Sequence, residues 1–135
     1  MHSDAGRPSG CPPEGAVPES GSFYRLSAPR HSPGDSTTED SWVLPLNTRK
    51  GPHYGNSSRC GAHAFSLFRD LESLRQAREL NAWAARKSIA MVDLDEDHGL
   101  VLDTPSEVGD SHCDWWPEPP SRVPDATIVE SRHDR

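Results

Sequence analysis

Apolar residues are too scarce and too unevenly placed for all 135 residues of this chain to pack into one core. Hydrophobic residues make up 33% of the sequence and the mean hydropathy is -0.77, which are low values for a fully folded domain. Prolines gather toward both ends, where serine, glycine and acidic residues are also frequent. The sequence therefore predicts a disordered tail over 1–40, a small folded domain over 41–117, and an acidic, proline-rich tail over 118–135.

Within the predicted domain, the clearest pattern is a helical stripe. Apolar residues follow the i, i+3, i+4, i+7, i+10 spacing of a single helix face: Ala64, Leu67, Phe68, Leu71 and Leu74. Asn81 is a natural end point, because asparagine tolerates the left-handed conformation of a helix C-terminus. One main helix is expected over 64–80.

Strand patterns flank this helix on both sides. A short strand is expected near 42–46, at a sheet edge because Pro45 lacks a backbone donor. A hairpin is expected over 88–104, with turn residues and Gly99 between its two apolar runs. The expected fold is α+β, with a small sheet of three to four strands packed on the one main helix.

The net charge of the chain is -7, and the charged residues are distributed unevenly along it. Residues 41–92 carry eight basic against three acidic side chains, whereas residues 93–135 carry three against twelve. Five cations of the basic region are candidates for binding a phosphate: Arg49, Lys50, Arg59, Arg86 and Lys87. The acidic balance of the whole chain argues against strong nonspecific binding to nucleic acid, so this class remains an alternative.

Cysteine and histidine residues form a candidate polar cleft whose members are Cys60, His63, His112, Cys113 and Asp114. The Cys60–His63 spacing suits one metal ion, and His112 with Cys113 would complete a zinc set. Adjacent ligands point in different directions, however, so no metal or cofactor is assigned. Sequence neighbours rarely form a catalytic thiol–imidazole–carboxylate set, so no catalytic residue is assigned either. Three cysteines, an odd number, do not indicate a disulfide framework.

The Trp115–Trp116 pair has two interpretations. Tryptophan buries a large area, so one ring is expected to close the core. The other could remain exposed and contact a partner. Both residues are therefore candidate partner contacts.

Three classes of function follow from these patterns. A small non-catalytic binding or accessory protein that docks on a protein partner is favoured, because the sequence contains no convincing catalytic motif. The alternatives are a nucleotide or nucleic-acid binder and a small zinc-binding or thiol-dependent enzyme. The sequence contains no apolar run long enough to span a membrane, and a cytoplasmic location is expected. Only two of the fourteen basic residues are lysine, a bias typical of GC-rich bacterial genomes.

Overall fold

The structure is a computed structural model that describes residues 9–27, 33–37, 42, 60–105, 111–118 and 126–130. Of the strand predicted near 42–46, only Trp42 belongs to this described part of the chain. The remainder of that predicted strand lies outside the described residues.

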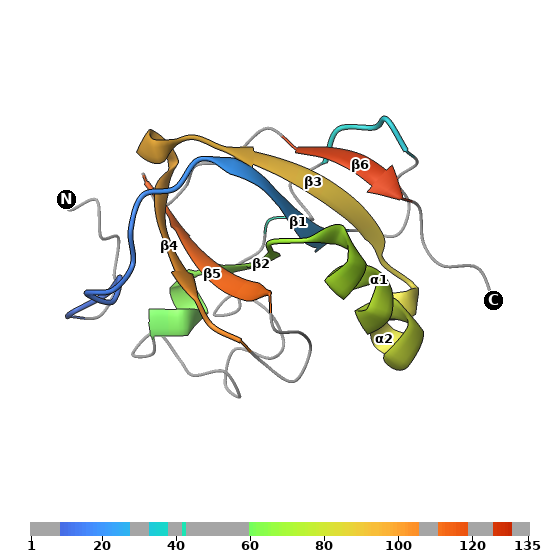
Figure 1. Ribbon diagram of the computed structural model, residues 1–135, viewed down its shortest axis with the longest axis horizontal. Helices are drawn as coiled ribbons and strands as arrows, with labels where there is room; N and C mark the ends of the chain where they lie inside the picture. The colour runs from blue at the N-terminus through green and yellow to red at the C-terminus, as the bar shows by residue number, and fades with distance from the viewer. Residues whose placement is uncertain are drawn as a thin grey trace.

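One antiparallel sheet of six strands forms the framework, in the order β4-β5-β2-β1-β3-β6 (Figure 1). Its strands are β1 (Gly21–Ser27), β2 (Phe65–Phe68), β3 (Ser88–Leu94), β4 (Gly99–Asp103), β5 (His112–Pro117) and β6 (Ala126–Glu130). The helices are α1 (Leu71–Leu80) and α2 (Ala82–Ala85), with short 3-10 turns η3 (Cys60–His63) and η4 (Glu96–His98). The prediction of three to four strands on one main helix is therefore wrong, since the sheet dominates and the helices are short.

Helix α1 begins seven residues later than the start of the predicted 64–80 helix. Asp70 caps it, because its side chain accepts a hydrogen bond from the Ser73 N–H at 2.8 Å. The residues before this cap form strand β2, in which Phe65 and Leu67 are buried and Ser66 is exposed. The apolar residues that predicted one long helix thus belong to a strand and to a helix. The Asp70 cap between these elements marks where the helix begins.

Strands β3 and β4 are connected by η4 but do not pair with each other, so the hairpin predicted over 88–104 is wrong. Strand β3 pairs with β1 on one side and with β6 on the other. Both of its edges are therefore occupied, and β4 instead turns away at the η4 corner to pair with β5 (Figure 1). Gly99 has the positive φ expected of a turn glycine, +131°.

Two strands of the sheet lie in segments that were predicted to be tails. Strand β1 falls within 1–40, yet it pairs with β3 along its whole length, from Gly21 opposite Leu94 to Ser27 opposite Ser88. Strand β6 falls within 118–135 and pairs with the other edge of β3. The predicted domain of 41–117 therefore omits a central strand and an edge strand of the fold.

Each face of the sheet carries its own apolar layer. On one face, here called the aromatic face, the buried residues include Phe23, Phe65, Leu67, Cys113 and Trp115. The Trp42 ring packs edge-on against the Phe65 ring, with centroids 5.2 Å apart. On the opposite face, the helix face, α1 places the fully buried Leu74 against Phe68 and Ile89. Burial on both faces explains why apolar residues follow one another without strict alternation in β3.

Short segments cover both edges of the sheet. Residues 11–19, here called the strap, reach the β4 edge, where Val17 and Val101 exchange two backbone hydrogen bonds of 2.9 and 2.7 Å. At the other edge, the Gly34 N–H donates to the Ile128 carbonyl at 2.8 Å. Unpaired edges invite pairing with other chains, so both contacts cover backbone groups that could otherwise pair with another strand.

Gly99→Ala is expected to destabilise the fold by at least about 2 kcal/mol, from a strained backbone and an added atom in an occupied space. A Cβ at residue 99 would lie 2.1 Å from the Trp116 carbonyl oxygen. Chemical denaturation measures the change in unfolding free energy. Gly61→Ala is the matched control, because no atom lies within 4 Å of its added Cβ, and it should change stability by less than about 0.5 kcal/mol.

Candidate functional site

Cys60, the first member of the predicted polar cleft, is not a free thiol. It forms a disulfide with Cys11, with Cα atoms 5.4 Å apart and the two partners 49 positions apart in sequence. The sequence does not indicate this bond, because three cysteines leave one unpaired whatever the pairing and because Cys11 lies in a predicted tail. The bond removes Cys60 as a zinc ligand or nucleophile in the oxidised protein.

Cys113 is the remaining cysteine, and it is fully buried on the aromatic face. Burial raises the pKa of its thiol to about 12, because the thiolate would lose its hydration. The positive charge of Arg69 opposes this effect without reversing it. A protonated, inaccessible thiol is a poor nucleophile and a poor metal ligand.

The structure does not bring the predicted cleft residues together. Cys60 and His63 lie in η3, beside the end of β5 that carries Trp116, whose indole N–H donates to the Cys60 carbonyl at 3.1 Å. His112 lies at the opposite end of β5, where it pairs with Phe68. Cys113 and Asp114 follow on the same strand but point to opposite faces, because side chains alternate along a strand.

Trp115 and Trp116 are both buried, with exposed fractions of 0% and 2%. The Trp115 indole N–H donates to the His98 carbonyl at 3.2 Å, and the Trp116 indole N–H donates to the Cys60 carbonyl, so both polar groups of the rings have partners. The sequence predicted that one of the two rings closes the core, and in the structure both rings are buried. Neither offers the exposed surface that a partner contact would need.

A smaller polar cluster does form on the helix face, from Thr104, His112 and Asp114. His112 Nδ1 lies 2.8 Å from the Thr104 carbonyl oxygen and 2.9 Å from its hydroxyl. The edge of the Phe68 ring packs against the imidazole, with centroids 5.2 Å apart. Burial raises the pKa of Asp114, while the charge of His112 and a hydrogen bond from Thr104 act in the opposite direction.

The Thr104 carbonyl determines which nitrogen of His112 carries the proton. A carbonyl oxygen only accepts, so Nδ1 must donate, and the neutral imidazole then presents Nε2 as an acceptor. This cluster therefore offers one oriented acceptor beside a half-buried carboxyl group. It contains two of the five predicted cleft residues, together with Thr104, for which the sequence pattern gives no signal.

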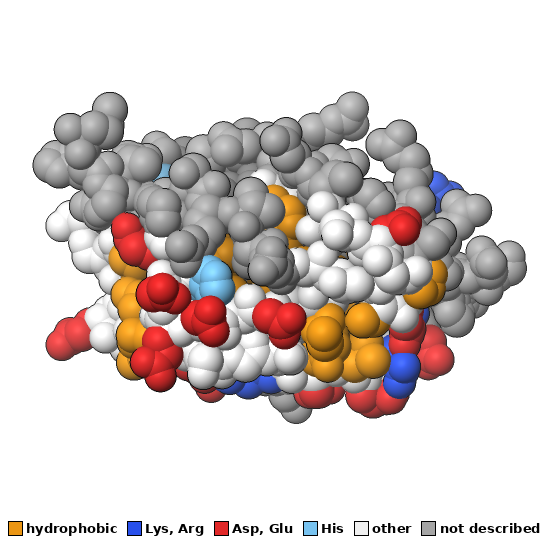
Figure 2. Space-filling model, turned by 90° about the horizontal axis from the view of Figure 1, so that it is seen from above, with side chains coloured by type: hydrophobic (Ala, Val, Ile, Leu, Met, Phe, Trp, Pro, Cys, Tyr) orange, Lys and Arg blue, Asp and Glu red, His pale blue; other side chains and the backbone are white. Residues whose placement is uncertain are grey.

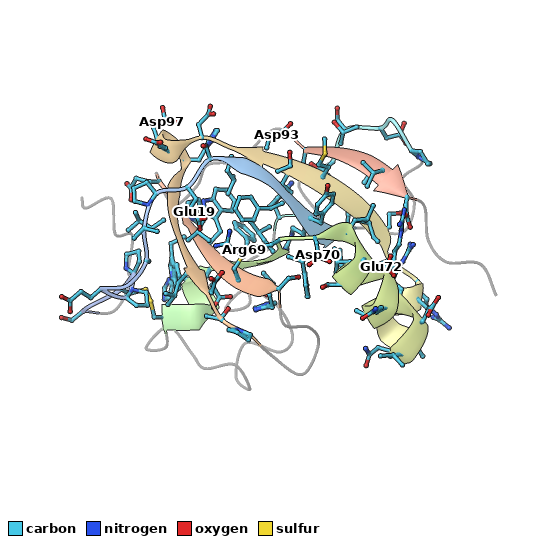
Figure 3. The ribbon with its side chains drawn as sticks, in the orientation of Figure 1. Glu19, Arg69, Asp70, Glu72, Asp93 and Asp97 are labelled. Carbon is cyan, nitrogen blue, oxygen red and sulfur yellow. A yellow bond between two sulfur atoms is a disulfide. The ribbon has the colours of Figure 1, made fainter. Side chains whose placement is uncertain are left out.

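Carboxylates gather at the corner where β3 passes into η4. The acidic corner comprises Asp93, Asp95, Glu96 and Asp97, all of them exposed. In Figure 2, which views the molecule from above, acidic side chains are spread over the half of the visible face nearer the η4 end of the sheet. Figure 3 shows Asp93 on β3 and Asp97 on η4. The corner itself is well anchored, because the His98 carbonyl accepts from both Trp115 Nε1 and the Glu118 N–H.

Within the described residues, Asp95, Asp97 and His98 form the one group of three or more side chains close enough to hold a metal ion. His98 Nδ1 accepts a hydrogen bond from the Asp95 N–H at 2.5 Å. Its neutral ring is then protonated at Nε2, so neither nitrogen has a lone pair for an ion. The histidine serves as part of a capping box that shapes the turn.

Two arginines on the aromatic face were not predicted as functional, and both hold parts of the fold together. Arg69 pairs with Glu19 of the strap and with Asp103 of β4, each at 2.6 Å, and these partners raise its pKa (Figure 3). Arg25 lies 5.0 Å from the ring centroids of Trp42 and Phe65, and burial lowers its pKa to about 10. The alternation of β1 could have indicated Arg25, had the segment been interpreted as a strand.

The predicted phosphate-binding set is only partly visible. Arg49, Lys50 and Arg59 lie outside the described residues. Arg86 and Lys87 are exposed where α2 ends and β3 begins. Phosphate binding by this set remains a prediction.

Comparison with known proteins gave no match among protein-family models, curated proteins or solved structures. The geometry of the described residues is therefore the basis for any functional proposal.

Cys113 is expected to resist alkylation in the folded protein. Iodoacetamide at pH 8 should modify it at least a hundredfold more slowly than in protein unfolded in guanidinium, because the folded thiol is buried and protonated. Mass spectrometry of timed samples measures both rates. Similar rates in the two states would place Cys113 at the surface.

The same pKa shift predicts how stability changes with pH. The folded thiol has the higher pKa, so its contribution to stability is complete below the unfolded value of about 8.5 and declines as pH rises toward 12. Denaturation of the wild type between pH 8 and 10.5 should show this decline. Cys113→Ala should weaken it, since the substituted side chain has no proton to lose.

Proposed function

We propose that this chain is a small, disulfide-stabilised binding protein that docks on a cationic protein partner through its acidic corner. The observation that carries the proposal is a set of exposed carboxylates on a turn anchored by the core. The Trp115 indole and the Glu118 N–H hold the His98 carbonyl from beneath at 3.2 and 2.9 Å. A charged surface on a rigid support binds with little loss of conformational entropy.

The charge distribution supports this choice of partner. The chain carries a net charge of -7, and residues 93–135 hold twelve of its twenty-one acidic side chains. Such a field attracts positively charged proteins and accelerates their association. It disfavours the backbone of a nucleic acid, so the nucleic-acid alternative is less well supported than the protein partner.

The thiol and zinc alternative has lost its main support. Its proposed residues are divided between a disulfide at Cys60, a buried thiol at Cys113 and an imidazole hydrogen-bonded to Thr104. A binding role requires none of these groups to react. It assigns them to the architecture that carries the acidic corner.

The disulfide also bears on location. Disulfides persist in oxidising compartments and are rare in the cytosol, where thiols are kept reduced. The Cys11–Cys60 bond therefore argues against the cytoplasmic location expected from the sequence, and we place the folded chain in an oxidising compartment. No helix in the described part of the chain is long and apolar enough to cross a membrane.

The proposal predicts charge-dependent binding that is localised to one corner. The probe is a ten-residue lysine peptide, with a ten-residue glutamate peptide as the negative control. The double variant Asp93→Asn/Glu96→Gln should bind the lysine peptide about two- to thirtyfold more weakly, if each exposed charge contributes ~0.2–1 kcal/mol. Titration calorimetry at 20 and 150 mM salt gives the affinity and its salt dependence.

A matched variant separates the corner from the overall charge. Glu72→Gln/Glu79→Gln removes the same charge from the exposed surface of α1, with Glu72 at the position labelled in Figure 3. Its affinity should remain within about twofold of the wild type, as expected of charges remote from the contact. Equal weakening in both double variants would show that the peptide responds only to net charge and would contradict the proposed site.

A further inference from the structure

We propose that the Cys11–Cys60 disulfide is a redox-sensitive latch that holds the strap against the sheet. Reduction by a small dithiol would release the strap and uncover the β4 edge while the sheet stays folded. This inference concerns a different region from the acidic corner, and it holds whether or not the corner binds a partner.

Among the described residues, the strap has few attachments to the rest of the fold. Its backbone contacts the sheet through the Val17–Val101 exchange, and its side chains add the ion pair between Glu19 and Arg69. Its buried apolar residues, Cys11 and Ala16, pack with Ala64 and Trp116 in a cluster separate from the two main layers. Val17 itself is 50% exposed.

These attachments differ in strength. The disulfide joins residues 49 positions apart, so it removes much of the freedom that the released strap would gain. The Arg69–Glu19 contact is bidentate, but the Arg69 side chain is 36% exposed and the Glu19 side chain 27%, so water and salt screen the attraction. The backbone bridge, the solvated ion pair and the small apolar cluster around Ala16 are therefore expected to open once the covalent link is broken.

The chemistry of release is thiol–disulfide exchange. One thiolate of the dithiol attacks a sulfur of the Cys11–Cys60 bond and forms a mixed disulfide, and the other cysteine leaves as a thiolate and takes up a proton. The second thiol of the reagent, as a thiolate, then attacks the reagent sulfur of the mixed disulfide. The bond to the protein sulfur breaks, and the second cysteine leaves as a thiolate and takes up a proton. The protein gains two electrons and two protons, and the dithiol is oxidised to a cyclic disulfide.

Strand β4 contains an internal reporter of this event. The Val101 N–H points outward and donates to the Val17 carbonyl at 2.7 Å. Backbone groups alternate in direction along a strand, so the N–H groups of Leu100 and Leu102 face β5 instead. Release of the strap should therefore expose one amide and spare its neighbours on the same strand.

Amide hydrogen exchange followed by NMR, with and without dithiothreitol at pH 7, tests the latch. In the reduced protein, the Val17 and Val101 amides should exchange at least tenfold faster, while Leu102 and Val92 remain unchanged. Cys11→Ser should reproduce the reduced pattern without reductant. Cys113→Ala, which keeps the buried position apolar, is the control and should behave as the oxidised wild type, because Cys113 takes no part in the bond.

Two results would overturn the proposal. Faster exchange at Val92 together with Val101 would show that reduction unfolds the sheet as a whole. Unchanged exchange at Val101 after complete reduction, verified by thiol mass labelling, would show that the strap stays in place without the bond. Glu19→Gln with the disulfide intact should leave Val101 protected, and loss of protection there would assign the latch to the ion pair.

Discussion

The pairing of β1 with β3 is the interaction on which the rest of the sheet depends. It extends over seven residue pairs, and β1 also contacts β2, so it joins the β4-β5-β2 half to the β3-β6 half. Phe23, on this strand, is buried in the aromatic layer that receives side chains from both halves. Without β1 each half would expose an unpaired edge and half of an apolar layer, and neither would be a stable unit.

Most of the side chains that could perform chemistry in this chain instead stabilise its architecture. Cys11 and Cys60 bind the strap, Arg69 connects the strap to β4, and His98 shapes the η4 turn. Their contacts satisfy hydrogen-bonding and charge requirements that a small domain with limited apolar area would otherwise leave open. Among the described residues, the charged groups left at the surface are largely carboxylates, and for this reason we propose recognition of a cationic partner.

Local pattern predicted some elements correctly and failed where distant contacts decide the structure. The β3 and β4 runs and the special conformation of Gly99 were visible in the sequence, because alternation and turn chemistry are local. The pairing of β3 with β1 was not, since nothing within residues 88–104 indicates that a strand from the apparent tail takes that edge. The average composition of residues 1–40 predicted a tail and so gave no sign of β1. Its apolar stretch from Phe23 to Leu26 is short and is surrounded by proline and serine. The predicted polar cleft was wrong for a similar reason. His112 and Cys113 are adjacent in sequence, but side chains alternate along a strand, so the two point to opposite faces of the sheet.

The contacts at the two sheet edges have a consequence for the order of assembly. Val17 bonds to Val101, Ser36 lies opposite Thr127, and β1 must find β3 some seventy residues later. These contacts join residues of the first third of the chain to strands β3, β4 and β6, and a chain emerging from the ribosome cannot make them until those later strands have been synthesised. Such topologies close large loops before they gain stability, which slows folding and lengthens the time that apolar strands are exposed. The early segments, β1 above all, would therefore be the part of the nascent chain most dependent on chaperone protection.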